Sequence, residues 1–252
     1  QFKQQYNLKA KELKVEVVKP LLTKYRKGRC SIEEKRRCWH IEYIDVPHFH
    51  LDVIPGYINN LYLNITDHDE EANTYEYIPS NPAGYISWFY DRCKYRREKL
   101  YEAYQVEHQL VLEQADIEDV KRRKIKTPLQ KVVQLLKRHR DVCFLDKRDD
   151  LKPVSIIITT ICANLYNNED NIYDALMSIL DNAAAYIINN KRDGLFYIEN
   201  PVCTDENFAD KWNTHPERAY AFLEWLNSAK NDLVGHRLEE YTKVDMGRHI
   251  KN

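Results

Sequence analysis

The 252-residue sequence lacks several features that would place it in a specialised class of protein. No run approaches the roughly 18 consecutive apolar residues that span a bilayer. The opening residues, QFKQQYNLKAKELK, contain no apolar signal-peptide core. No CxxC pair occurs among the six scattered cysteines, so we expect reduced, mostly buried thiols in place of zinc ligands or disulfides. These absences predict a cytosolic protein with no membrane partner.

The sequence also lacks a large net charge. The 38 Lys and Arg residues balance 39 Asp and Glu residues, leaving a formal charge of -1. No field of the whole molecule therefore draws the chain to polyanions, and any binding of them must be local. Hydrophobic residues make up 43% of the sequence, which at this length is enough to bury a core. A folded globular protein is expected.

The order of patterns along the chain predicts an α+β fold. Apolar residues at helical spacing predict an amphipathic helix over residues 8–25, and strand-like runs at 37–44 and 49–54 predict an antiparallel hairpin. A second strand pair, 62–65 and 74–78, brackets an acidic stretch, 66–71, that we expect to be a solvated loop. From residue 81 onward the pattern is helical. The expected helices lie near 82–104, 127–143, 153–166, 171–190 and 215–234, with a charged surface connector over 107–126. We therefore place the domain boundary between residues 1–80 and 81–252.

The stretch Phe49–Gly56 carries the most informative polar residue. Asp52 interrupts an apolar strand that ends in Pro-Gly, and the period of two places His50 on the same face as Asp52. A carboxylate among apolar residues costs free energy unless it is paired or binds a metal. Taken alone, however, an Asp at a strand end is more often a turn cap, and His50 is more often a packing residue.

Two other segments also allow two interpretations. The stretch QLLKRHR at 134–140 fits an amphipathic helix with its basic groups in water. That helix would turn five apolar residues toward the core: Leu129, Val132, Val133, Leu136 and Val142. Tyr57, expected in a loop just beyond the Asp52 strand, is a candidate for stacking on a nucleobase. Tyr85, Trp88 and Phe89 lie at helical spacing and are more simply core residues.

Several segments resemble one family when they are taken in order. The runs Arg37–Tyr43 and Phe49–Pro55 resemble the hairpin that carries the third metal-site carboxylate in polymerase-beta-like nucleotidyltransferases, and within them in the bacterial CD-NTases. The resemblance covers about residues 35 to 227 and continues through 80–89, 126–141, 152–160, 199–201 and 206–212. It implies part of a nucleotidyltransferase sheet followed by a helical domain.

The resemblance also implies a function and a set of site residues. CD-NTases join nucleoside triphosphates into a cyclic di- or trinucleotide signal in antiphage operons, which implies ATP and other nucleotides as substrates and an operon-encoded regulatory protein as a partner. Asp52 would be the third carboxylate around Mg²⁺ or Mn²⁺ ions. Lys137 and Ser155 would reach the donor triphosphate, for which an ammonium and a hydroxyl group are suited.

One segment that the resemblance predicts is absent from this sequence. The family carries a Gly-Ser pair and an Asp-x-Asp strand before the hairpin, whereas the sequence has no Gly-Ser pair and no Asp before Asp45. We therefore expect an upstream segment or a second chain to supply these carboxylates, and the 252 residues alone to be inactive and prone to aggregate. A linear nucleotidyltransferase and a non-catalytic module that binds nucleotide or a partner remain alternatives.

Overall fold

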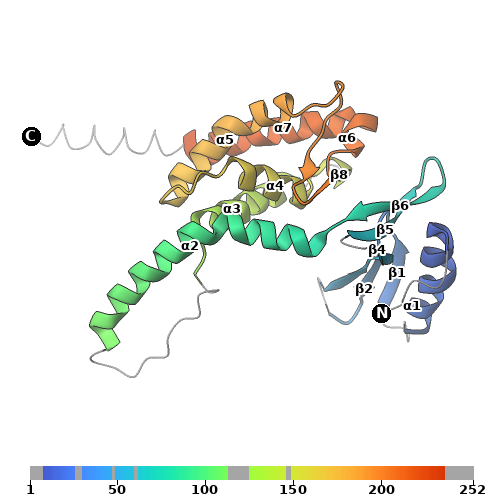
Figure 1. Cartoon of the computed structure of the whole chain (residues 1–252). Coiled ribbons are helices and arrows are strands. Elements are labelled where there is room, and N and C mark those ends of the chain that lie inside the picture. Colours follow the sequence, from blue (N-terminus) through green and yellow to red (C-terminus); the bar gives the residue numbers. More distant parts are fainter. Residues whose placement is uncertain are drawn as a thin grey trace, which may run out of the picture. The chain divides into compact units, whose positions relative to one another are not determined.

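The structure is a computed structural model that describes residues 8–25, 30–46, 49–59, 62–112, 125–145 and 149–235 (Figure 1). The described residues divide into two compact units. The first holds those within 1–85 and 201–206, and the second those within 86–200 and 207–252. Antiparallel sheets followed by a helical region confirm the predicted α+β class. The division falls at residues 85 to 86, later than the boundary expected at 80 to 81, and a short segment from far along the chain joins the first unit.

Two antiparallel sheets form the first unit. One contains β1 (Cys30–Glu34), β2 (Trp39–Tyr43) and β3 (His50–Val53) in the order β1-β2-β3. The other contains β4 (Gly56–Asn59), β5 (Tyr62–Asp69) and β6 (Thr74–Ser80) in the order β4-β5-β6. The predicted hairpin is confirmed as β2 and β3, and the second strand pair as β5 and β6. Strands β1 and β4 were not predicted, because β1 is mostly polar and β4 follows Pro55 directly, where the sequence suggested a loop.

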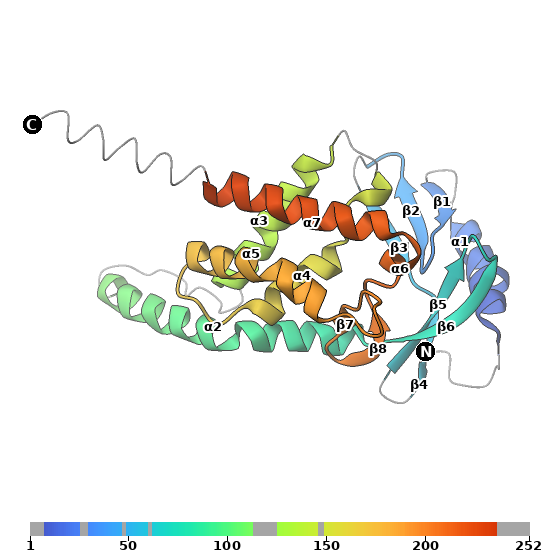
Figure 2. The same ribbon diagram turned by 90° about the horizontal axis from the view of Figure 1, so that it is seen from above.

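The predicted helix near the start of the chain is present, but the prediction of which face it buries is wrong. Residues Glu12–Val18 are wound as a π-helix, η1, which continues into α1 (Lys19–Tyr25) beside the first sheet (Figures 1 and 2). A π-helix bonds residues i and i+5, so apolar residues spaced for an α-helix no longer align on one face. Lys14 is instead fully buried, and Leu21 is 51% exposed. The Lys14 ammonium donates to two main-chain carbonyl oxygens between β1 and β2, at 2.6 and 2.8 Å.

The acidic stretch 66–71 is not the solvated loop that its composition predicted. Its first four residues belong to β5, and Asp67 is only 4% exposed. The Arg36 guanidinium donates to both Asp67 carboxylate oxygens, each at 2.7 Å. Glu206 is also buried, and it accepts a hydrogen bond from Ser80 at 3.1 Å. A buried charge is stable only with a partner, and both Asp67 and Glu206 have one. Their contacts link distant parts of the chain within the first unit.

The second unit is helical, as predicted. Its main helices are α2 (Pro82–Leu112, which begins in the first unit), α3 (Pro128–Cys143), α4 (Ser155–Leu165), α5 (Ile172–Asn189), α6 (Lys211–Thr214) and α7 (Pro216–Lys230). Short turns form η3 (Asp149–Leu151) and η4 (Asn231–Gly235). Two short strands that were not predicted also follow α5: β7 (Glu199–Asn200), and β8 (Cys203–Asn207), most of which belongs to the 201–206 segment of the first unit. Helices α3, α4, α5 and α7 lie side by side (Figure 2). No described helix is long and apolar enough to cross a membrane.

The core of the helical unit follows the apolar pattern with two corrections. Leu129, Val132, Val133 and Leu136 are buried on α3 as expected, but Val142 is 50% exposed near the end of the helix. Helix α2 continues past residue 104 to Leu112, so the start of the expected connector is helical. Residues 113–124 of that connector lie outside the described part of the chain. Four of the six cysteines are buried, in agreement with the expectation of mostly buried thiols.

Candidate functional site

The first sheet has a polar face that collects groups able to bind a metal. In the strand register, Glu33 lies opposite His40, His40 opposite Asp52, and Glu42 opposite His50. Residues directly opposite each other in an antiparallel pair point to the same face of the sheet. Three carboxylates and two imidazoles therefore share one face. All of these side chains are exposed except His40, which is partly buried.

Asp52 lies inside β3, on the outer face of the sheet and not in a turn. Its side chain is 49% exposed, and one carboxylate oxygen lies 2.8 Å from Nδ1 of His40. Leu51, expected on a buried face, is 47% exposed. The sequence left open whether Asp52 is paired or binds a metal; the structure shows it paired with His40 and half exposed, so its position does not by itself require a metal. The residue is accessible to an ion from outside.

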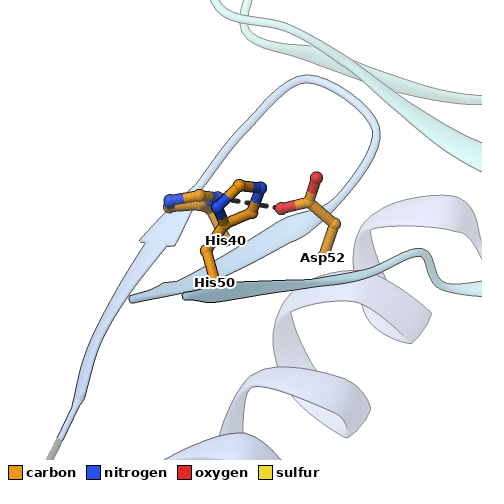
Figure 3. Close-up of side chains that lie close together, drawn as sticks. All are labelled: His40, His50 and Asp52. Atoms are coloured by element: carbon orange, nitrogen blue, oxygen red, sulfur yellow. Dashed lines mark hydrogen bonds and ion pairs between the residues drawn. The ribbon is translucent and has the colours of Figure 1, made fainter. Parts of the chain in front are cut away.

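Two more groups surround Asp52. The imidazole rings of His40 and His50 lie 4.9 Å apart between centroids, and Figure 3 shows the Asp52 carboxylate directed toward them. The Cys38 thiol is near enough for a hydrogen bond with the Asp52 carboxylate. Burial raises the pKa of the Cys38 thiol, and the negative charge of Asp52 raises it further. Sequence reasoning identified His50 only as a neighbour of Asp52, and it did not identify His40 or Cys38.

Tyr57 lies on β4, a strand, and not in the loop that the sequence suggested. Its ring is 38% exposed and meets the ring of Tyr77 edge to face, with centroids 4.8 Å apart. An exposed aromatic ring fixed by a second ring is suited to stacking. Its role in base stacking stays a prediction.

The two residues expected near the triphosphate lie on neighbouring helices of the second unit. Lys137 is in the middle of α3, and Ser155 is the first residue of α4. Arg140, one turn after Lys137, is 8% exposed and donates from Nη1 to the Ser155 hydroxyl oxygen at 2.7 Å and to the Pro153 carbonyl oxygen at 2.8 Å. Burial lowers the pKa of the Lys137 ammonium, and the charge of Arg140 lowers it further.

Arg140 thus places a positive charge beside the Ser155 hydroxyl group, and Lys137 lies one turn before Arg140 on α3. A site with a partly desolvated ammonium and a fixed hydroxyl favours the binding of an anion such as a phosphate. The sequence reasoning assigned no role to Arg140, although its position one turn after Lys137 was a usable signal. The structure thus groups Asp52 with two histidines in the first unit and joins Ser155 to Arg140 in the second, while a shared site for Lys137 and Ser155 stays a prediction.

Comparisons with known proteins indicate the family to which this chain is related. No protein-family model matches the chain. The chain is 32% identical over 216 residues to a c-di-GMP synthase of Roseivirga ehrenbergii, a match that covers 82% of this chain and 54% of that protein. Its fold is similar to that of the Bradyrhizobium diazoefficiens CD-NTase CdnG in complex with GTP, with a TM-score of 0.63 and 21% identity over 93% of this chain and 70% of that one.

This chain is a relative of the CD-NTases. The family resemblance of the hairpin and the helical segments is thereby confirmed, and so is the order of a nucleotidyltransferase sheet followed by helices. The chain spans about half the length of the curated relative that it matches.

Proposed function

We propose that this CD-NTase relative is part of a nucleotidyltransferase that joins nucleoside triphosphates into a cyclic di- or trinucleotide. The observation that carries the proposal is the 32% identity to a c-di-GMP synthase over most of the chain. The names of that relative and of CdnG, whose structure contains GTP, support GTP as a substrate. ATP, which the family resemblance implies, is the second candidate nucleotide.

In the proposed reaction, a ribose hydroxyl oxygen of one nucleotide forms a bond to the α-phosphorus of another. The bond from that phosphorus to the bridging oxygen breaks, pyrophosphate leaves, and the hydroxyl proton passes to solvent. Repetition of this step within the linear product closes the ring. Two divalent ions, Mg²⁺ or Mn²⁺, would activate the hydroxyl group and neutralise the leaving pyrophosphate.

The described residues fit part of this role. Asp52 offers a half-exposed carboxylate on an open polar face, which suits a hard cation that keeps several of its waters. Lys137 would neutralise a phosphate oxygen. Because Arg140 donates to the Ser155 oxygen, the hydroxyl proton of Ser155 is left to donate to another phosphate oxygen. The main-chain N–H groups in the first turn of α4 would add to this attraction. Tyr57 would stack on a base.

The proposal can be tested by product analysis. The protein encoded by the natural reading frame that contains these residues is incubated with Mg²⁺ and all four NTPs, each labelled in turn at the α-phosphate. We expect a phosphatase-resistant product of two or three nucleotides that carries label from GTP, and none from Asp52→Asn. A phosphatase-sensitive product would favour the linear nucleotidyltransferase, and tight NTP binding without any product would favour the binding module.

The biological setting is also part of the proposal. We infer a role in antiphage defence together with an operon-encoded regulatory protein, on the strength of the family resemblance. Cells that carry the operon are challenged with phage, and the parent is compared with Asp52→Asn. Protection that survives the substitution would contradict a role for the cyclic nucleotide.

A further inference from the structure

We propose that His40, His50 and Asp52 form a binding site for a divalent transition-metal ion of the zinc type. One ligand atom from each residue lies within 4.8 Å of the other two, and the His40 Nδ1 to Asp52 oxygen distance is 2.8 Å. Ligand atoms around a tetrahedral zinc ion are about 3.3 Å apart, as its bond lengths of about 2 Å require. Small rotations of these side chains, which stand on an open strand face (Figure 3), would admit the ion.

The donor types select the class of metal. Mg²⁺ prefers carboxylate, carbonyl and water oxygens, whereas imidazole nitrogen favours zinc, cobalt and nickel. Two imidazoles and one carboxylate are the ligand set of open zinc sites, which keep a fourth position for water or another ligand. The Glu42 carboxylate opposite His50 is a further donor on the same face. This face therefore favours zinc over magnesium.

A purely structural role explains these residues less well. A hydrogen bond between two partly exposed side chains contributes at most about 1 kcal/mol to stability, and the His50 side chain is exposed. The three side chains nevertheless converge from two strands onto one point in solvent. Such convergence of unlike donors is expected of a binding site.

A second trio in the described part of the chain, His139, Cys143 and Asp232, has the wrong hydrogen bonding for a metal. Trp225 donates its indole N–H to Nδ1 of His139 at 3.0 Å, so Nδ1 must be unprotonated there. A metal on Nε2 would require the proton on Nδ1, which would then face the indole donor. His139 instead links α3 to η4 through its 3.0 Å contact with Asp232. This trio serves as a control.

The inference shares Asp52 with the proposed function and deepens it. An ion held by His40 and His50 would take the Asp52 carboxylate away from the proposed magnesium site. Zinc would then inhibit nucleotide joining, and the histidines would set the concentration at which it does so.

The test is metal binding by the protein that the natural reading frame encodes. Zinc is titrated by calorimetry in the presence of excess Mg²⁺, and Co²⁺ is titrated while the visible bands of a four-coordinate ion are recorded. We expect one ion per chain, with an affinity at least about tenfold lower in His40→Ala, His50→Ala and His50→Gln. Glu33→Gln, on the same face, and His139→Gln, in the other trio, should bind as the parent does. Circular dichroism confirms that each variant is folded.

The outcomes separate this inference from the proposed function. Binding that is unchanged in both alanine variants, or that Mg²⁺ abolishes at equal concentration, would overturn the metal site even if the protein makes a cyclic nucleotide. If zinc binding depends on the histidines but the protein makes no nucleotide product, the metal site is supported and the proposed function is refuted. If both hold, zinc should inhibit synthesis by the parent at lower concentration than it inhibits His50→Ala.

Discussion

Arg140 offers a sharp test of how the helical unit holds its proposed triphosphate contacts. Its guanidinium is buried and donates from Nη1 to the Pro153 carbonyl oxygen and the Ser155 hydroxyl oxygen, while Nε and Nη2 donate to Asp141 at 3.1 and 2.8 Å. The substitution Arg140→Met keeps the apolar stem and removes only the charged donors. It therefore isolates the contribution of the guanidinium.

The expected loss of stability follows from these contacts. Each hydrogen bond from a charged donor contributes about 1.5–3 kcal/mol, and two of them end on groups in or beside the core. The ion pair with Asp141, whose side chain is 39% exposed, adds at most about 1 kcal/mol. New apolar contacts of methionine offset part of the loss, so we expect a decrease of about 3 kcal/mol. For a protein of this size that lowers the melting temperature by about 6–12 °C.

Tryptophan fluorescence during urea unfolding provides the assay, because three of the four tryptophans, Trp88, Trp212 and Trp225, belong to the helical unit. The matched control is Arg138→Met, since Arg138 is exposed on the same helix and its replacement should change stability by less than about 0.5 kcal/mol. NTP affinity should also fall in Arg140→Met, because the Ser155 hydroxyl is no longer held. Equal stability of the two variants would refute the anchoring role of Arg140.

Three further substitutions test single residues. Asp52→Asn should abolish product formation in the proposed enzyme while circular dichroism stays unchanged, because the half-exposed amide keeps the shape and loses the charge; normal turnover would exclude Asp52 from the metal site. Lys137→Ala should weaken NTP binding in calorimetry more than it lowers the melting temperature, and equal affinity would exclude a triphosphate contact. Lys14→Met should cost about 2–4 kcal/mol, because two carbonyl oxygens lose their donor. Burial lowers the pKa of Lys14 below 10.5, so the unfolded chain binds more protons at this site between the two values, and the stability difference between the parent and Lys14→Met should widen as pH rises there. A difference that stays constant through this range would contradict the assignment.

The predictable parts of the fold are those that local pattern determines. The hairpin was predicted because polar and apolar residues alternate through β2 and β3, and alternation requires one solvated face. The start of α3 was predicted from Pro128, and the structure adds a capping box between Thr127 and Gln130. Helices α4, α5 and α7 were found for the same reason, since each carries its own start signal or apolar stripe, whereas the four-residue α6 was not predicted.

The parts that were missed depend on partners far along the chain. Asp67 was assigned to a solvated loop because its neighbours are acidic, yet Arg36, 31 residues away, pairs with it in the core of the first unit. Ser80 and Glu206 are 126 residues apart and still form a hydrogen bond. No local pattern reports a buried ion pair, because its stability arises from two charges that only folding brings together.

The candidate site divides in the same way. The sequence by itself determined that Asp52 and His50 share a face and that Ser155 lies in the first turn of a helix, because strand and helix periods are properties of the local backbone. Only the tertiary structure decided that His40 lies opposite Asp52, that Asp52 faces solvent, and that Arg140 holds Ser155. Strand register and helix packing depend on contacts between segments that are distant in the sequence. These contacts lower the free energy of the whole unit, so no single segment specifies them.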